Sequence, residues 1–139
     1  MPQAKDDYVI VTQGLEKTYA SDGVSVFAVR GVDIEVRNGE FTAVVGPSGS
    51  GKTTLLNLIS GLDRPTGGTV WLGGQDLAAV SGRALSDFRR DHVGFVFQAY
   101  NLVPVLTVAE NVEYVMLLQG VPRDERRQRE QEQVGDRGE

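Results

Sequence analysis

The chain has 139 residues, enough for one domain or part of a larger protein, and its 40% hydrophobic and 24% charged content indicates a globular core. A formal net charge of −5 argues against a general nucleic-acid binder, because such a surface repels phosphate backbones. The sequence contains no cysteine, which excludes disulfides and thiolate metal sites, and it offers neither a signal peptide nor a run of about 18 apolar residues. These features predict a cytosolic domain that reaches a membrane only through a partner.

The first part of the chain predicts β-strands. Residues 8–12 and 27–29 are rich in β-branched or apolar side chains, and residues 32–37 alternate apolar and charged residues, which is typical of a half-buried antiparallel strand. Asn38-Gly39 then predicts a hairpin with a type I′ turn, because both central positions of that turn need a positive φ. The apolar residues 41–45 are interpreted as a buried strand that ends in a glycine-rich loop.

A helix is predicted from about Gly51, because leucine and isoleucine recur at helical spacing up to Leu62. Gly61 and Pro65 mark its end. The next predicted elements are strands at residues 69–72 and 92–98 and a short helix at residues 81–91.

The last predicted helix opens with a capping box, Thr107 to Glu110, and runs to about Gln119. Beyond it, residues 123–139 consist mainly of charged and polar side chains and have no apolar stripe. We expect this segment to be a solvated, frayed helix or disordered. The chain therefore divides into a domain portion, residues 1–122, and a charged tail, residues 123–139.

The glycine-rich loop has the spacing of a P-loop, Gly46-x-x-x-x-Gly51-Lys52-Thr53. Its glycines let the backbone curl around phosphate groups, so that the amides of residues 49–54 converge at the positive end of the following helix. Lys52 is expected to reach the β- and γ-phosphates, the Thr53 hydroxyl to bind Mg²⁺, and Thr54 to donate to the α-phosphate. A chance glycine-rich turn is the alternative, but the strand before the loop and the helix after it are the context that the motif requires.

Two segments, GPSGSGKTTLLNLISGLDRPTGGTV and FRRDHVGFVFQAYNLVPVLTVAENV, resemble the nucleotide-binding subunit of ABC transporters. Within that family the chain is most similar to the branch that serves lipoprotein release, macrolide efflux and FtsX-like permeases, over residues 8–122. The resemblance implies an α/β fold, with a P-loop NTPase core and an antiparallel β subdomain. It also implies ATP and Mg²⁺ as cofactors, an integral-membrane permease and a second ATP-binding subunit as partners, and a peripheral location at the inner face of the cell membrane.

The resemblance assigns roles outside the loop. Tyr19, in LEKTY, matches the aromatic residue that stacks on adenine; packing against its neighbours is the alternative. Gln98, in FVFQ, matches a glutamine that reaches Mg²⁺ or the attacking water; a polar strand end is the alternative. Residues 99–110 would receive the permease, unless the apolar residues 102–106 pack internally. The predicted nucleotide contacts are Tyr19, Gly46, Ser48, Gly49, Ser50, Gly51, Lys52, Thr53, Thr54 and Gln98, with Thr53 and Gln98 as metal ligands.

Several motifs that the family uses for hydrolysis are absent from the 139 residues. The sequence contains no LSGGQ signature, no apolar strand that ends in Asp-Glu, and no switch histidine. We therefore expect the N-terminal portion of an ATP-binding subunit, truncated before the signature and Walker B motifs and without catalytic residues of its own. Its predicted function is ATP binding coupled to a permease, and isolated ATPase activity is not expected. The alternatives are a catalytically silent nucleotide-binding or interaction module and, disfavoured by the FVFQ match, a P-loop kinase of small molecules.

Overall fold

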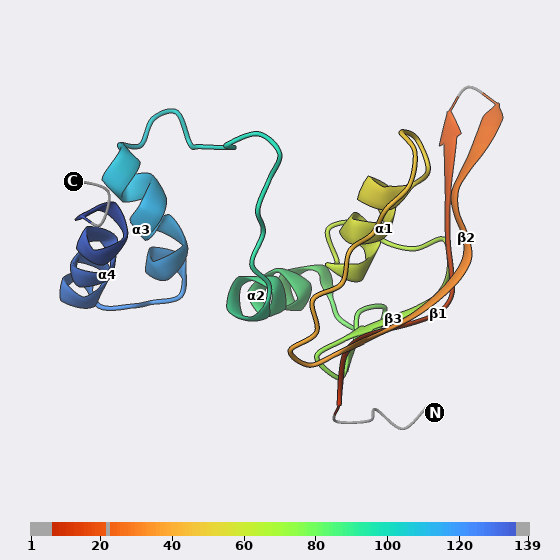
Figure 1. Ribbon diagram of the computed structural model, residues 1–139, viewed down its shortest axis with the longest axis horizontal. Helices are drawn as coiled ribbons and strands as arrows, with labels where there is room; N and C mark the ends of the chain where they lie inside the picture. The colour runs from red at the N-terminus through yellow and green to blue at the C-terminus, as the bar shows by residue number, and fades with distance from the viewer. Residues whose placement is uncertain (1–6, 22, 136–139) are drawn as a thin grey trace. The chain divides into compact units, whose positions relative to one another are not determined.

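The computed structural model describes residues 7–21 and 23–135, which belong to two compact units, Met1–Arg89 and Arg90–Glu139 (Figure 1). Each unit is described by itself. The elements in chain order are β1 (Tyr8–Ser21), β2 (Val24–Arg37), α1 (Lys52–Ile59), β3 (Gly67–Leu72), β4 (Gln75–Asp76), α2 (Gly82–His92), α3 (Val108–Leu118) and α4 (Arg123–Gly135).

The first unit is built on a four-stranded sheet with the order β2-β1-β3-β4, in which every neighbouring pair is antiparallel. β1 and β2 form a long hairpin, and Figure 1 shows both as extended ribbons. The alternation predicted for residues 32–37 is confirmed, because Val36 is buried and Val32 and Ile34 are half-buried, whereas the charged residues between them are exposed. The sheet therefore has one wet face in this region.

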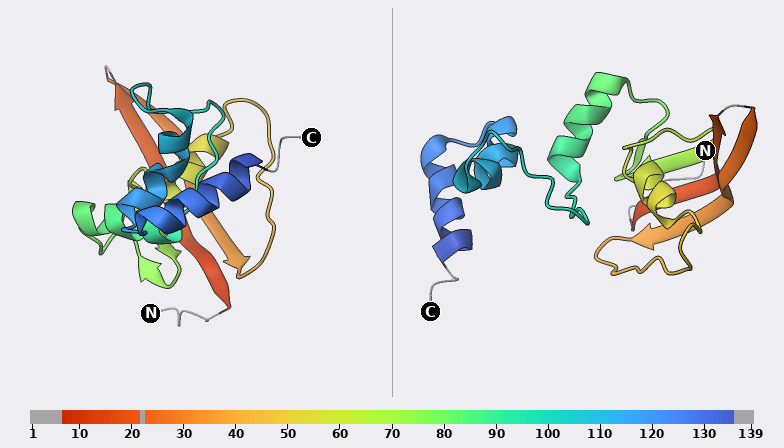
Figure 2. Two further views of the ribbon diagram at one scale, coloured as in Figure 1. Left: turned by 90° about the vertical axis from the view of Figure 1, so that its left-hand side faces the viewer. Right: turned by 90° about the horizontal axis from the view of Figure 1, so that it is seen from above.

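The core of the first unit lies between the sheet and α1, which packs on one of its faces (Figure 2). Leu55 and Leu58 are the buried residues of α1, and they share the core with Leu15 of β1 and Val70 of β3. Leu58 is only 1% exposed. Burying such a side chain contributes about 1.5–3 kcal/mol, so this contact fixes the helix that follows the glycine-rich loop onto the sheet.

The predicted strand at residues 41–45 is wrong. This segment has no regular secondary structure, and its apolar side chains are exposed, Phe41 to 97% and Val45 to 87%. A buried strand needs neighbours for its N–H and C=O groups, and within the described residues the sheet consists of β1 to β4 alone. The prediction of a type I′ turn at Asn38-Gly39 is wrong as well, because that turn needs a positive φ at both residues. Gly39 has a φ of 76°, but Asn38 does not have a positive φ, since Asn101 is the one described non-glycine residue that does.

The predicted strand at residues 92–98 is also wrong. α2 continues to His92, and residues 93–97 have no regular secondary structure. Phe95 and Phe97 stack on each other, with ring centroids 5.7 Å apart, but Val96 and Phe97 are exposed. The segment is therefore rich in apolar residues, but it does not pair with any strand of the described sheet.

The second unit contains a pair of packed helices, α3 and α4. The capping box is confirmed, since the Thr107 side chain accepts a hydrogen bond from the Glu110 N–H and the Glu110 carboxylate accepts one from the Thr107 N–H. The charged tail is helical from Arg123 to Gly135, and residues 136–139 lie outside the described part of the chain. Arg126 of α4 forms a mostly buried ion pair with Glu113 of α3 at 3.2 Å, which explains how a helix without an apolar stripe packs on its neighbour.

Candidate functional site

The glycine-rich loop between β2 and α1 has the shape of a cradle. Gly49 and Gly51 have φ values of 77° and 90°, in the left-handed region that side chains other than glycine rarely adopt. Ser50 N–H donates to the Pro47 carbonyl at 3.3 Å, which closes a turn inside the loop. A Cβ at Gly46 would lie 2.8 Å from the Ser50 hydroxyl, so the loop curls back on itself and a side chain at position 46 would displace that hydroxyl.

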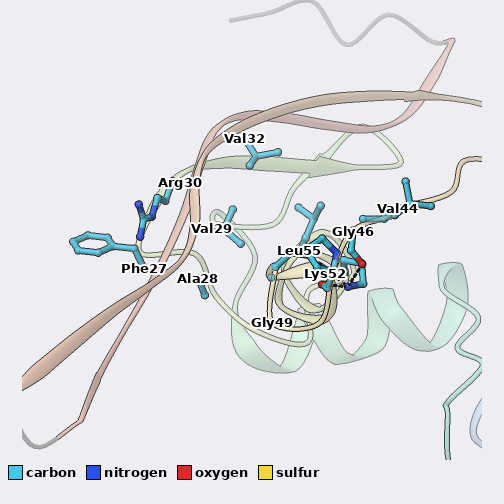
Figure 3. Close-up of a pocket in the computed structure, with 14 residues that line it drawn as sticks. Phe27, Ala28, Val29, Arg30, Val32, Val44, Gly46, Gly49, Lys52 and Leu55 are labelled. Atoms are coloured by element: carbon cyan, nitrogen blue, oxygen red, sulfur yellow. Dashed lines mark hydrogen bonds between the residues drawn. The ribbon is translucent and has the colours of Figure 1, made fainter.

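Lys52 directs its ammonium group into this loop. Its Nζ donates to the carbonyl oxygens of Gly46 at 2.9 Å and Pro47 at 2.7 Å, and lies 3.4 Å from the Ser50 hydroxyl (Figure 3). A positive charge is thus held among the backbone groups of the loop. An anion that enters the loop would meet this charge directly, and it would compete with the two carbonyl oxygens for the ammonium protons.

The N-terminus of α1 opens onto the same loop. Gly51 is its N-cap, no side chain of the described residues caps it, and its first turn contains no acidic residue. The first amides of a helix lack intrahelical partners and carry the positive end of the helix dipole. The arrangement is therefore suited to bind a phosphate group, with Thr53 exposed and Thr54 half-buried in the first turn.

A hollow of about 550 Å³ lies between the loop and β2, a size typical of a ligand pocket. Its walls are the loop and α1 on one side and part of β2 on the other, with lining residues that include Val29, Val32, Gly46, Lys52 and Leu55. In Figure 3, Phe27 and Arg30 also line it, but their side chains are turned away from Lys52. The wall formed by β2 was not predicted from the sequence, because residues 27–32 carry no motif.

Tyr19 lies on β1, opposite Val26 of β2, and is 42% exposed. It is not one of the residues that line the hollow, although its neighbour Thr18 pairs with Phe27, which does. Its phenol hydroxyl donates to Asp63 Oδ2 at 2.8 Å, and the Lys17 Nζ lies 4.9 Å from the centre of its ring. The ring is therefore held at its polar end, and much of its surface is open to solvent.

Asp63, to which no role was assigned from the sequence, organises this region. Its Oδ1 accepts from Lys17 Nζ at 2.7 Å, and Lys17 also donates to the Arg64 carbonyl at 2.7 Å. The hydrogen bond from Lys17 holds the pKa of the Asp63 carboxyl below its usual range; hydrogen bonds from Tyr19 and the Arg64 N–H act in the same direction, and partial burial opposes them. Asp63 is therefore an anion at neutral pH.

The metal site predicted at Thr53 and Gln98 has no acidic cluster to support it. Within residues 7–21 and 23–135, no three His, Cys, Asp or Glu side chains are grouped so that they could hold a metal ion. A cation at this site would depend on the Thr53 hydroxyl and on phosphate oxygens. Gln98 is exposed in the second compact unit, so its role at the metal stays a prediction.

In the second unit, the segment predicted to receive a permease is open to solvent over much of its length. Leu102 and Val105 are 58% and 89% exposed. Asn111 of α3 holds this segment in place. Its Oδ1 accepts from the Val103 N–H at 2.8 Å, and its Nδ2 donates to the carbonyls of Val103, Leu106 and Thr107 at 3.3, 3.2 and 2.9 Å.

None of the described helices has the length and apolar character needed to cross a membrane.

Comparison with known sequences gives consistent results. The sequence profile of the ABC transporter family matches residues 29–138. An uncharacterized ABC transporter ATP-binding protein from Thermotoga maritima is 48% identical over 116 residues, which cover 84% of this chain and 50% of that protein. The lipoprotein-releasing system ATP-binding protein LolD from Chromohalobacter salexigens is 42% identical over 129 residues, 93% of this chain and 54% of LolD. The macrolide export ATP-binding/permease protein MacB from Rhodopseudomonas palustris is 43% identical over 120 residues, 86% of this chain and 18% of MacB.

Solved structures agree with the sequence matches. The ATP-binding cassette MJ0796, in a dimeric post-hydrolysis state bound to ADP and Pi, superposes with a TM-score of 0.81 at 38% identity, over 88% of this chain and 54% of that one. A second dimeric structure of MJ0796 gives a TM-score of 0.82 at 39% identity, over 86% of this chain and 53% of that one. The predicted fold class is therefore confirmed. The chain spans about half the length of these structures and of the Thermotoga and Chromohalobacter relatives.

Proposed function

This chain belongs to the ABC transporter family and corresponds to part of its ATP-binding cassette, and on that premise we propose that residues 46–54 bind the phosphates of ATP together with Mg²⁺. The observation that carries the proposal is the position of Lys52, whose ammonium group lies inside a glycine loop at the uncapped start of α1. Charge, backbone donors and space for an anion are combined at one place.

Each part of the loop has a role in this proposal. Lys52 exchanges its hydrogen bonds to the Gly46 and Pro47 carbonyls for the β- and γ-phosphates. The amides of residues 49–54 donate to phosphate oxygens, Thr54 adds a hydroxyl donor at the α-phosphate, and Thr53 offers its hydroxyl to Mg²⁺, with Gln98 as the second proposed ligand. A Mg²⁺ ion held there would neutralise part of the phosphate charge.

The base would stack on Tyr19. A phenol ring that is 42% exposed offers an open aromatic surface, and stacking on such a surface is worth about 1–3 kcal/mol. Tyr19 is on the strand next to the one that forms a wall of the hollow, which supports this role.

The proposed partners are a membrane permease and a second ATP-binding subunit. The name of MacB combines ATP binding with a permease, LolD is named as part of a lipoprotein-releasing system, and the solved MJ0796 cassettes are dimers. On this chain, the exposed apolar residues Leu102 and Val105, in the segment held by Asn111, are the proposed contact with the permease. This contact would keep the protein at the inner face of the membrane. Nucleotide binding without turnover is the second candidate function for these 139 residues taken by themselves, since they contain neither an Asp-Glu strand nor an LSGGQ motif.

Calorimetric titration of the purified chain with ATP in the presence of Mg²⁺ tests the proposal. We expect binding, and we expect Lys52→Ala to weaken it by roughly 1.5–3 kcal/mol, because a charge-assisted contact is lost. Arg83→Ala is the matched control, since it removes one positive charge from an exposed position of α2 outside the loop. Equal affinities of the parent chain and Lys52→Ala would contradict the proposal.

A further inference from the structure

Lys17, Tyr19 and Asp63 form a cluster that joins β1 to the chain segment after α1. Asp63 uses both carboxylate oxygens: Oδ1 accepts from Lys17 Nζ at 2.7 Å and from the Arg64 N–H at 2.7 Å, and Oδ2 accepts from the Tyr19 hydroxyl at 2.8 Å. Lys17 and Tyr19 are two residues apart on one strand, so both side chains point to the same face and reach the same carboxylate.

The cluster is anchored to the helix that begins at the phosphate loop. The N–H groups of Leu62 and Asp63 both donate to the Asn57 carbonyl in α1, at 2.8 and 3.0 Å. α1 is a short helix of 8 residues whose first residue is Lys52. A short chain of contacts therefore connects the Tyr19 ring to the helix whose N-terminus faces the loop.

The distribution of burial within the cluster is uneven. The side chains of Lys17 and Asp63 are 11% and 31% exposed, whereas Tyr19 is 42% exposed. The Lys17 ammonium lies over the ring, 4.9 Å from its centroid, so it covers one face. Lys17 is thus largely buried, Asp63 is partly exposed, and the ring that they hold remains accessible.

From this geometry we propose that Lys17 and Asp63 are positioning residues that fix the Tyr19 ring as the platform for the purine base. This inference rests on the proposed nucleotide site. A ring that is already held in one orientation loses less conformational freedom when a base stacks on it. The hydroxyl of Tyr19 then matters for binding of the base, although a base stacks on the ring and not on the hydroxyl.

The test compares affinities for two probes, ATP and inorganic tripolyphosphate, both with Mg²⁺, on the full chain. We expect Tyr19→Phe to weaken ATP binding by about three- to tenfold, the range for loss of one hydrogen bond. Asp63→Ala should weaken it at least as much, because it also removes the ion pair with Lys17, and both variants should leave tripolyphosphate binding unchanged. The double variant should be no weaker for ATP than the weaker single variant, because both changes break the same contact. Asp76→Ala is the matched control, since Asp76 also follows α1 but accepts from the Ala78 N–H and not from the cluster.

Three results separate the possible failures. If Tyr19→Ala binds ATP like the parent chain, the base does not stack on Tyr19, and both this inference and that part of the proposed function are wrong. If Tyr19→Ala loses ATP affinity but Tyr19→Phe does not, stacking stands and the positioning inference alone is wrong. If Asp63→Ala weakens both probes equally, the cluster supports the fold only, which also overturns the inference. Tyr19→Phe removes a single hydroxyl from a partly exposed ring, so this arm does not depend on whether Asp63→Ala folds.

Discussion

Gly51 lies so close to Ala28 that a Cβ at position 51 would overlap the Ala28 carbonyl oxygen. Ala28 belongs to β2, and Gly51 is the N-cap of α1, so the end of the glycine loop packs directly against the sheet at this contact. The loop is therefore positioned by two elements, the helix that it starts and the strand that it touches.

This contact predicts different costs for alanine at two glycines of the loop. Gly49→Ala should lower the free energy of unfolding by about 1–2 kcal/mol, since Gly49 has a φ of 77° but open space around it. Gly51→Ala should lose about 1–3 kcal/mol more, because its methyl group also meets the strand. Urea denaturation followed by fluorescence of the single tryptophan, Trp71 in β3, measures both. Equal losses would mean that the loop moves away from β2 at little cost.

Asn111 is expected to keep the exposed segment at residues 103–107 ordered. Asn111→Ala removes its hydrogen bonds to Val103, Leu106 and Thr107, so the Val103 amide, which donates to the Asn111 side chain, should exchange with solvent deuterium roughly tenfold faster. Gln128→Ala is the control, because the exposed Gln128 side chain donates to Glu132 on the next turn of α4. Unchanged exchange in Asn111→Ala would show that the segment is held by other contacts.

Glu110 makes the stability of α3 depend on pH in the acidic range. The N–H of Thr107, and then its hydroxyl, donate to the carboxylate and hold the pKa of Glu110 below its usual range. A group whose pKa is lowered by folding stabilises the folded state above its unfolded pKa, and this stabilisation is lost as the pH falls through the folded pKa. The stabilisation that the Glu110 carboxylate gives to the folded state should therefore be constant from neutral pH down to about pH 5. It should decrease once the pH falls below the ordinary glutamate pKa of about 4.3.

An NMR titration of the Glu110 carboxyl carbon checks this expectation. Thr107→Ala should raise the pKa of Glu110, because the hydroxyl donor is removed, whereas Thr69→Val, in the other compact unit, should leave it unchanged. A Glu110 pKa that stays the same in Thr107→Ala would assign the effect to the backbone donor alone.

The chain of 139 residues should bind ATP without hydrolysing it. No carboxylate in the sequence follows an apolar strand as Asp-Glu, and loss of general-base assistance costs about 10²–10⁴-fold in rate. Loss of a donor to the transferred phosphate costs a further factor of about 10²–10³. A phosphate-release assay with Mg²⁺ should give the background rate. Release that is abolished by Lys52→Ala would contradict this, and Glu110→Gln and Glu113→Gln would then identify the responsible carboxylate.

Structural elements that depend on residues close together in the sequence were predictable. The capping box depends on two residues three apart, and Thr107 is the N-cap of α3 as predicted. The helix after the P-loop depends on a local pattern of leucines, and α1 begins at Lys52, close to the predicted start. The segments at residues 41–45 and 92–98 were mispredicted, because apolar content indicates a buried strand only where another strand is available to pair with it.

The same distinction applies to the candidate site. Spacing alone identifies the loop that holds Lys52, since its residues are neighbours in the sequence. The contact between Tyr19 and Asp63 joins residues 44 positions apart, and no motif marks Asp63 as its partner. The part of β2 that faces the loop was missed for the same reason, because only the fold brings Ala28 to Gly51.

The confinement of the sheet, the loop and α1 to Met1–Arg89 has a consequence for biosynthesis. Chains fold from the N-terminus as they leave the ribosome, and the sheet, the loop and α1 are synthesised before α3 and α4. A ligand that binds only the folded form stabilises it by mass action, by about 2.7 kcal/mol at 100 times its Kd. Cellular ATP would then act on the nascent chain as a folding ligand and stabilise the first unit while the second is still being made.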